Sequence, residues 1–376
     1  MKIAIDAIGI NKFGGGRTAT LKLLEALFQL DTENEYVVAV SAVEPTFENG
    51  AGNVRQWVIP VKNRFLVRIY AQMMFPREFR DFDVIHFTKN LNLVGLLPPQ
   101  VVTIFDLTAL LHPELMPRVD YWYYSTVQKF TMRQAKRVIA ISKDAAKGVE
   151  QYYRTPSERI RVVYLAAGEH FKPMPESAVQ TARAKYGISE DYFIHVGHID
   201  RKKNLTLLVR AYDQACKQTG FTGNLVLVGE AYPKGHDANL IPTIEALGLK
   251  EKVIFTGGAT DAELPALLSG AIAKVYPSVH EGFGLAAIEA LACGTPLITG
   301  HSGAVSEVVG DAGIVLDTIT VDKVACAMVR LIEDTQLRQD LHRRGLERAG
   351  LFSWKEAARQ TLEIYREAAE EKRKKA

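Results

Sequence analysis

The sequence has few cysteines and no excess of charge of one sign. Its 376 residues include three cysteines, Cys216, Cys293 and Cys326, which lie far apart and form no CxxC pair. This spacing argues against a zinc site or a disulfide framework and favours a reducing compartment. Lys and Arg number 46 against 43 Asp and Glu, a formal net charge of +3. Because the positive and negative charges are nearly equal in number, a protein whose main work is to coat nucleic acid is excluded.

Long hydrophobic runs are also absent. Crossing a bilayer takes an apolar run of about 20 residues, and the nearest candidate, residues 91–111, contains Asn92 and Asp106. Residues 2–7 are apolar but include Asp6 and no small-residue cleavage site, so they indicate a buried strand and not a signal peptide. We expect a cytoplasmic protein, with the inner face of the membrane as the alternative location and any membrane contact peripheral.

What the sequence contains is an alternation of short β-rich runs with helix-length segments, typical of parallel sheets covered by helices. The segment 168–176 has two prolines and no periodicity and separates two such series. We therefore predict an α/β protein with Rossmann-like domains over residues 1–170 and 171–355. A final helix over 356–376 packs back onto the first domain or ends as a solvated tail. The strands are predicted at 2–6, 36–41, 54–59, 84–87, 101–105, 138–141, 192–196, 225–228, 253–255, 274–276, 296–299 and 314–316.

The strongest local signal is the segment 277–298, P-S-V-H-E-G-F-G-L-A-A-I-E-A-L-A-C-G-T-P-L-I. It predicts a strand end, a glycine-flanked turn, and a helix that begins near Gly284 and stops at Gly294. The start of a helix has backbone N–H groups without intrahelical acceptors, at the positive end of the helix dipole. We therefore expect an anion such as a diphosphate at the backbone of Gly282, Phe283, Gly284 and Leu285.

Two glutamates eight positions apart belong to this segment. Glu281 lies in the turn, and Glu289 lies within the helix with its side chain leaning back toward the amino terminus. Acidic side chains that face a crevice pair with hydroxyl groups, which a sugar or ribose supplies. The alternative interpretation is that Glu289 is an exposed helix residue and Glu281 an N-terminal cap.

The pattern E-G-F-G-L-x-x-x-E resembles the hallmark of the retaining GT-B glycosyltransferases of family four, also called glycosyl transferases group 1. The resemblance implies two Rossmann-like domains with the active site in the interdomain cleft, the first domain on the acceptor side and the second binding the nucleotide sugar. It also implies that Glu281 faces the donor sugar, that the amides of residues 283–285 hold the diphosphate, and that Glu289 binds the ribose hydroxyls.

A second match, H-V-G-H-I-D-R-K-K-N-L over residues 195–205, resembles the family's G-x-x-x-x-R-K-N-L. A departing nucleoside diphosphate leaves negative charge, which fixed cations neutralise where no metal does so. Lys203 aligns with the family's phosphate lysine, and either Arg201 or Lys202 takes the second cationic role. Since no D-x-D follows a strand, we predict no metal and no cofactor, with the nucleoside-diphosphate sugar as substrate. A solvated basic turn is the alternative.

Near the amino terminus, G-G-G-R over residues 14–17 opens an amphipathic helix. Gly15 and Gly16 permit close approach of a ligand to the backbone, and with Arg17 they resemble the family's GGxxR-like loop, which approaches the donor phosphates. The alternative is a flexible structural loop. The spacing is not G-x-G-x-x-G, which argues against a dinucleotide oxidoreductase.

The segment 101–114, V-V-T-I-F-D-L-T-A-L-L-H-P-E, resembles the family's T-I-H-D-L strand end, but Phe105 replaces the histidine. Asp106 remains at the next position, and His86 lies at a predicted strand tip near the cleft, so both are candidates to orient an acceptor hydroxyl. Retaining enzymes of this fold are thought to let the departing phosphate take the acceptor proton, so a missing side-chain base need not abolish activity. The alternative is a non-catalytic nucleotide-sugar-binding subunit of a glycan-assembly complex.

Two segments mix basic and aromatic residues: 62–80, which includes Arg64 and Arg68, and 121–124, Y-W-Y-Y. They suit a lipid surface or an acceptor glycan, or else they are amphipathic helices packed on the sheet. The segments G-G-G-R and T-I-F-D-L most resemble mannosyltransferase-like members of the family, and this resemblance implies an enzyme of polysaccharide biosynthesis. It would transfer a sugar with retention from a nucleoside-diphosphate donor, GDP-mannose first and UDP-sugars next, to a glycan or lipid-linked acceptor.

Overall fold

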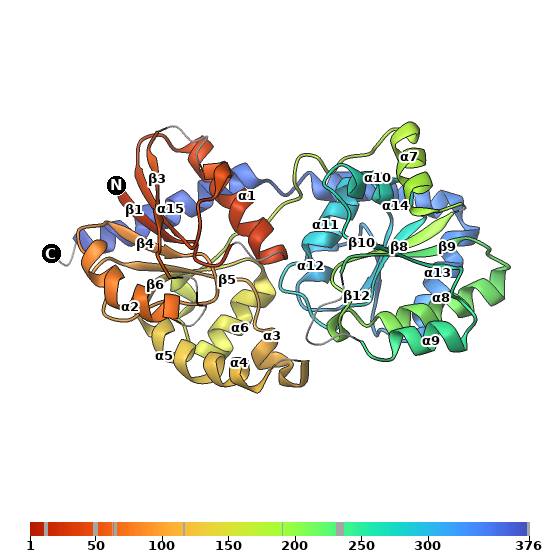
Figure 1. Ribbon diagram of the computed structural model, residues 1–376, viewed down its shortest axis with the longest axis horizontal. Helices are drawn as coiled ribbons and strands as arrows, with labels where there is room; N and C mark the ends of the chain where they lie inside the picture. The colour runs from red at the N-terminus through yellow and green to blue at the C-terminus, as the bar shows by residue number, and fades with distance from the viewer. Residues whose placement is uncertain are drawn as a thin grey trace. The chain divides into compact units, whose positions relative to one another are not determined.

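The computed structural model describes residues 1–10, 14–47, 52–61, 63, 66–115, 117–189, 191–230 and 237–373. The chain forms two compact units (Figure 1). Unit 1 is Met1–Leu165 together with Ser353–Ala376, and unit 2 is Ala166–Phe352. The chain therefore leaves unit 1 after Leu165 and returns to it at Ser353. We had expected these limits at residues 170 and 355.

Unit 1 is built on a parallel sheet with the strand order β3-β2-β1-β4-β5-β6-β7. Its central strands are apolar runs buried along their whole length, as parallel strands covered on both faces are. The strands are β1 (Lys2–Asp6), β2 (Glu35–Val40), β3 (Val54–Val58), β4 (Val84–Phe87), β5 (Gln100–Ile104), β6 (Ala135–Ala140) and β7 (Ile160–Val162).

Helices cover both faces of this sheet. On one face α1 (Gly15–Leu30) packs beside the carboxy-terminal helix α15 (Trp354–Arg373), and apolar residues every three or four positions along α1 face the strands. On the other face lie α2 (Leu66–Glu78) and α6 (Lys143–Tyr153). The shorter helices of unit 1 are α3 (Thr108–Leu111), α4 (Arg118–Trp122) and α5 (Lys129–Thr131), with a π-helical turn at Tyr123–Gln128.

Unit 2 is built on a second parallel sheet with the order β10-β9-β8-β11-β12-β13. The strands are β8 (Tyr192–Val196), β9 (Asn224–Val228), β10 (Val253–Gly257), β11 (Ala273–Tyr276), β12 (Leu297–Gly300) and β13 (Ile314–Leu316). One face is covered by α8 (Leu205–Thr219), α9 (Leu240–Ala246) and α13 (Val321–Glu333). The other is covered by α7 (Glu176–Tyr186), α10 (Glu263–Ser269) and α11 (Leu285–Ala292). The remaining helices are α12 (Val305–Val309) and α14 (Thr335–Ala349).

The predicted alternation of strands and helices is confirmed. Each predicted strand has an observed counterpart whose ends differ by a few residues at most, the usual uncertainty of element boundaries. The strand that we missed is β7, a half-buried run of three residues with Arg161 at its centre. It is too short and too polar to produce a hydrophobic period.

Candidate functional site

The strand order of unit 2 reverses between β8 and β11, and the loops after these two strands meet at their carboxyl ends. The amide of Val279, after β11, donates a hydrogen bond to the carbonyl of Lys202, after β8, at 2.9 Å. Such a reversal is where open α/β sheets bind ligands. Both motifs that we singled out in the second half of the sequence therefore lie at one place.

The loop after β8 is a 3-10 turn over Arg201–Lys203 that leads into α8. The carboxylate of Asp200 caps this turn by accepting a hydrogen bond from the amide of Lys203 at 3.1 Å. Asn204 then adopts a left-handed backbone with φ of 55°, which asparagine tolerates better than most residues. The capping Asp and the left-handed Asn thus fix the backbone from which the basic side chains project.

Glu281 is held through its backbone by the loop after β12. Its amide donates to the carbonyl of Ser302 at 3.2 Å, and its carbonyl accepts from the amide of Ala304 at 2.9 Å. Gly303, between them, has φ of +64°, and a Cβ there would lie 2.4 Å from the Glu281 carbonyl oxygen. Only glycine fits that approach, so Gly303 is part of what positions Glu281.

Lys203 and Glu281 form a buried ion pair. Lys203 Nζ lies 2.6 Å from Oε1 of Glu281, and the two side chains are 13% and 12% exposed. The same ammonium lies 3.5 Å from the hydroxyl of Tyr276 and 5.2 Å from its ring centroid. Burial would raise the pKa of Glu281, but the charges of Lys203 and Lys202 outweigh it and lower that pKa to about 2. Glu281 is therefore a carboxylate at neutral pH.

The first turn of α11 begins four residues after Glu281. The helix begins at Leu285, after Gly284 with φ of 89°, and the side chain of Phe283 is buried beneath the turn. Amides in a first helical turn have no carbonyl one turn earlier to accept their hydrogens. Gly282 to Leu285 thus lie where we predicted an anion-binding backbone. Glu289, further along the helix, is half-buried and not exposed, and burial raises its pKa.

Sequence reasoning missed Lys274 and Tyr276, both on β11. Lys274 has no exposed surface, and its Nζ donates a hydrogen bond to the carbonyl of Ala286 in α11. Burial lowers its pKa, while the negative charge of Glu289 raises it. The one available signal was a lysine inside the otherwise apolar strand A-K-V-Y.

In unit 1, Gly15 and Gly16 are the first residues of α1, after Gly14 with φ of 135°. Arg17 follows in the first helical turn. Its guanidinium lies 3.2 Å from Oε2 of Glu44, and its side chain is 30% exposed. The predicted phosphate-binding arginine thus already has a carboxylate partner, so an incoming anion would compete with or add to that pair.

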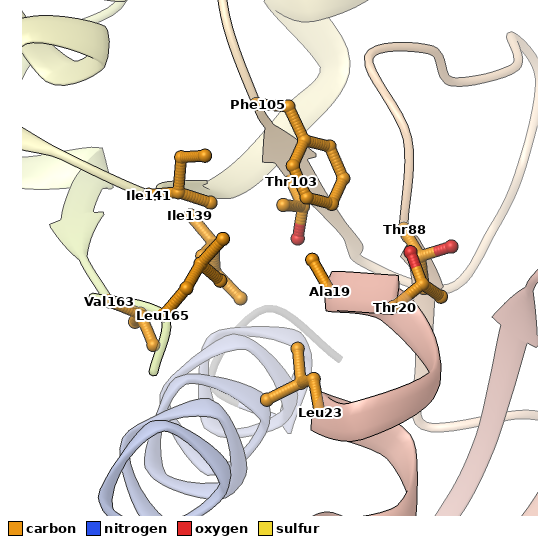
Figure 2. Close-up of a pocket in the computed structure, with 10 residues that line it drawn as sticks. All are labelled: Ala19, Thr20, Leu23, Thr88, Thr103, Phe105, Ile139, Ile141, Val163 and Leu165. Atoms are coloured by element: carbon orange, nitrogen blue, oxygen red, sulfur yellow. The ribbon is translucent and has the colours of Figure 1, made fainter. Parts of the chain in front are cut away.

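Phe105 lines an apolar pocket between α1 and the carboxyl ends of the strands (Figure 2). The hydroxyl of Thr88 there donates to the carbonyl of Asp6 at 2.8 Å, and that of Thr103 is bound to His86. Asp106, the next residue, is not one of the residues that line the pocket. One of its carboxylate oxygens accepts a hydrogen bond from the amide of Thr108 at 3.3 Å. The pocket is lined by Ala19, Thr20, Leu23, Thr88, Thr103, Phe105, Ile139, Ile141, Val163 and Leu165.

The prediction that His86, at a strand tip near the cleft, could orient an acceptor hydroxyl is contradicted by its burial. His86 is within β4 and has no exposed surface. Its Nδ1 lies 2.6 Å from the hydroxyl of Tyr365 on α15, and its Nε2 lies 2.7 Å from Oγ1 of Thr103. Burial lowers its pKa to about 3, so the ring is neutral. Both ring nitrogens are engaged inside the core, and His86 ties the sheet to α15 instead of touching an acceptor.

The basic and aromatic segments are partly packed and partly exposed. Lys62 and Arg64 lie outside the described residues. On α2, Val67, Ala71 and Phe75 face the sheet, whereas a row on the other side of the helix is exposed: Leu66, Ile69 and Met73, at 54%, 57% and 72%. A second exposed apolar set, from α4 to α5, consists of Val119, Tyr121, Trp122 and Phe130.

None of the helices described is both long enough and apolar enough to span a membrane. Across the described part of the chain, no three His, Cys, Asp or Glu side chains are grouped as a metal ion would require.

Residues 13–166 match the family model Glycosyltransferase Family 4, and residues 179–348 match the model Glycosyl transferases group 1. The two models together span every strand of both parallel sheets except β1, and the second contains both motifs of unit 2. The chain is a group 1 glycosyltransferase. The predicted family is thus confirmed.

Relatives of this glycosyltransferase include several mannosyltransferases. It is 27% identical to the O-antigen chain mannosyltransferase B of Escherichia coli, over 88% of each chain. It is 28% identical to the MMP alpha-(1->4)-mannosyltransferase of Mycolicibacterium hassiacum, over 77% of this chain and 71% of the relative. It also spans 31% of the length of the E. coli serotype-specific mannosyltransferase WbdA, at 29% identity.

Solved glycosyltransferase structures share the fold along almost the whole length. HepE of Anabaena, crystallised with UDP and glucose, has a TM-score of 0.77 at 20% identity, covering 96% of this chain and 98% of HepE. The sucrose-phosphate synthase of Thermosynechococcus elongatus has a TM-score of 0.79 at 21% identity, covering 98% of each chain. The predicted GT-B fold is confirmed.

Proposed function

We propose that this glycosyltransferase moves a sugar from a nucleoside-diphosphate donor to a hydroxyl group of a glycan or lipid-linked acceptor, with retention at the anomeric carbon and without a metal ion. GDP-mannose is the first candidate for the donor, because the relatives named above are mannosyltransferases. UDP-sugars are the second, because HepE was crystallised with UDP. The O-antigen relative supports a glycan acceptor.

The observation that carries this proposal is the Lys203–Glu281 pair beside the first turn of α11. An ammonium has three donor hydrogens, and Glu281 takes one of them. The hydroxyl of Tyr276, 3.5 Å away, takes a second, so Lys203 is held in place with one hydrogen left for a phosphate oxygen. Fixed cations and helix amides of this kind stabilise a leaving diphosphate as a metal ion would. Lys202 is the better second cation, since its charge acts on Glu281.

In the proposed reaction, the bond from the anomeric carbon to the phosphate oxygen breaks and the acceptor oxygen bonds to the same face of the sugar. The acceptor proton passes to the departing phosphate. Glu281 faces the developing charge at the sugar, and Glu289 holds the ribose hydroxyls. Phe105 supplies no base, so Asp106 would orient the acceptor only, and Arg17 would assist the donor phosphates.

We also propose that unit 1 rests on a lipid surface when the acceptor is lipid-linked. Support comes from the exposed row Leu66, Ile69 and Met73 on α2, which is followed by exposed Arg77 and Arg80. An apolar row beside basic residues is the arrangement that binds anionic membranes peripherally.

Two variants test the assigned roles. Glu289→Gln should weaken binding of free GDP and of the donor alike, because ribose contacts are similar in the ground and transition states. Glu281→Gln should leave GDP affinity nearly intact and lower turnover, because its contact matters as charge develops at the sugar. Calorimetry with GDP and UDP, beside steady-state kinetics, measures both. Equal loss of nucleotide affinity in the two variants would contradict this division. Binding without any turnover of the wild-type protein would favour the non-catalytic subunit.

A further inference from the structure

A lysine inside the sheet of unit 2 reaches the start of α11. Lys274 is fully buried on β11, and its ammonium contacts two groups that carry no net charge. One is the carbonyl of Ala286, which accepts its hydrogen bond, and the other is the ring of Tyr276, whose centroid is 4.8 Å away. A buried ammonium is costly unless a full negative charge compensates it. The structure must therefore supply an anion nearby.

Glu289 is the carboxylate whose charge acts most strongly on Lys274. Ala286 and Glu289 are three residues apart on α11, so they lie on the same face of the helix. A helical side chain leans toward the amino terminus, which directs the Glu289 carboxylate toward the turn that contains Ala286. The two charges act on each other: Glu289 favours the ammonium form of Lys274, and Lys274 favours the carboxylate form of Glu289.

The other groups around this pair do not replace either partner. Lys203 is matched by Glu281 at 2.6 Å, so its charge is already compensated. Asp261 opposes ionisation of Glu289. Three further neighbours are neutral, because burial raises the pKa of the Cys293 thiol to about 12 and of the Tyr276 phenol well above its usual value, and lowers that of His195 to about 3. Lys274 is the cation whose charge favours the ionised form of Glu289.

We propose that Lys274 is a positioning residue for donor binding, whose buried ammonium favours the carboxylate form of Glu289. The proposal rests on the proposed function, which gives Glu289 the ribose hydroxyls. An ionised carboxylate accepts hydrogen bonds from both hydroxyls of a ribose, whereas a protonated one must use one oxygen as a donor. Lys274 thus acts on the nucleotide through Glu289 and touches no ligand itself.

The test is the pH dependence of GDP affinity, measured by calorimetry between about pH 6 and pH 9 for the wild type and Lys274→Met. Methionine fills a similar volume without charge. Without the ammonium, the pKa of Glu289 should rise, so affinity should be lost as pH falls through that higher value. We expect the pH at which GDP affinity is half lost to move up by at least about one pH unit. Binding should then be about tenfold weaker near neutrality and should recover at high pH. Lys217→Met, at an exposed lysine paired only with Asp213, should change nothing.

Two further variants separate this role from a structural one. Glu289→Gln should remove the difference in pH midpoint between the two backgrounds, because the titration of GDP itself is common to both. Lys274→Met combined with Glu289→Gln should bind GDP no more weakly than Glu289→Gln alone. An unchanged midpoint in Lys274→Met overturns the proposal. If Lys274→Met does not fold, the double variant decides instead: a GDP affinity more than about tenfold below that of Glu289→Gln alone overturns the proposal. Failure of the wild type to bind GDP or UDP would refute the proposed function, and this inference with it.

Discussion

At the scale of single residues, Lys203 and Glu281 work as a unit because each is the counter-charge of the other. They lie 78 positions apart in sequence and 2.6 Å apart in space. The pairing costs desolvation but fixes the ammonium before any ligand arrives, and preorganised charge is what stabilises a transition state most effectively. Removing one member leaves the other charged and buried, so single substitutions here should have large effects.

Lys203→Ala should lose roughly 3 kcal/mol of transition-state stabilisation, on the scale of one preorganised electrostatic donor, or about a hundredfold in turnover. The measurement is release of nucleoside diphosphate at saturating donor. Lys217→Ala, at an exposed lysine of α8, is the matched control and should keep full activity. Unchanged turnover in Lys203→Ala would remove Lys203 from the reaction.

The ion pair also makes stability depend on pH. The pKa of Glu281 is lowered from 4.5 to about 2, so its ionised form stabilises the folded state above about pH 4.5, and that contribution is lost as pH falls toward 2. Urea unfolding of the wild type and Glu281→Gln should therefore show a stability difference at pH 7 that shrinks progressively below pH 4.5. A difference independent of pH over this range would mean that Glu281 is not held as a carboxylate by its lysine.

Residue types at motif positions could be read from the sequence, whereas their partners could not. Glu281 and Lys203 were recognisable from two motifs, but their contact follows from the parallel pairing of β8 with β11, which no local pattern encodes. His86 was misplaced because a histidine at the end of an apolar run looks accessible until α15 covers it. Lys274 was missed because a single lysine within an apolar run does not change the prediction of a buried strand, and the pattern gives that lysine no role of its own.

At the scale of elements, α15 completes unit 1. It packs beside α1, and the hydroxyl of its Tyr365 reaches the ring of His86 in the sheet. The ion pairs of Glu367 with Arg137 and Arg161 fasten the same helix to β6 and β7. The sequence left open whether the end of the chain is a solvated tail; the described part of it is a helix docked on the sheet.

Tyr365→Phe tests whether His86 is a structural contact between the sheet and α15 and not a residue that touches the acceptor. It leaves the buried Nδ1 without its partner and should cost about 1–3 kcal/mol of unfolding free energy, with turnover nearly unchanged. Urea unfolding and steady-state kinetics measure the two quantities. Tyr365 has no exposed surface, so the comparison is Thr361→Ala, which is also buried on α15 and whose hydroxyl donates to the carbonyl of Ala357 in the same helix. A large loss of turnover with unchanged stability would return His86 to the reaction.

The exposed row of α2 should be required for membrane contact. Changing Leu66, Ile69 and Met73 together to Gln should lower binding to anionic phospholipid vesicles by more than about tenfold, since each lost apolar contact is worth roughly 1–2 kcal/mol. Co-sedimentation measures it. Ile241 and Leu351 of unit 2, 52% and 72% exposed, provide the control when changed to Gln. Equal binding by both variants and the wild type would show that α2 does not rest on lipid.

At the scale of the whole molecule, the regular alternation of buried strands and helices made the fold predictable. Parallel strands buried on both faces are apolar throughout, so they stand out from the helices between them. Family motifs at the carboxyl ends of β8 and β11 then pointed to the candidate site in unit 2. The site of unit 1 was less predictable, because Arg17 has Glu44 as a partner and Phe105 lines an apolar pocket, and neither contact is visible in a motif.

The central claim is metal-independent transfer with retention from a nucleoside-diphosphate sugar, and slow donor hydrolysis tests it without knowledge of the acceptor. Time-resolved proton NMR of GDP-α-mannose with the enzyme, in excess EDTA, follows GDP and the first mannose anomer released. Water then takes the place of the acceptor, and its oxygen bonds to the face from which the phosphate leaves. The account predicts α-mannose first, followed by mutarotation, with EDTA present throughout. Release of β-mannose first, or release only after a divalent ion is restored, would contradict it.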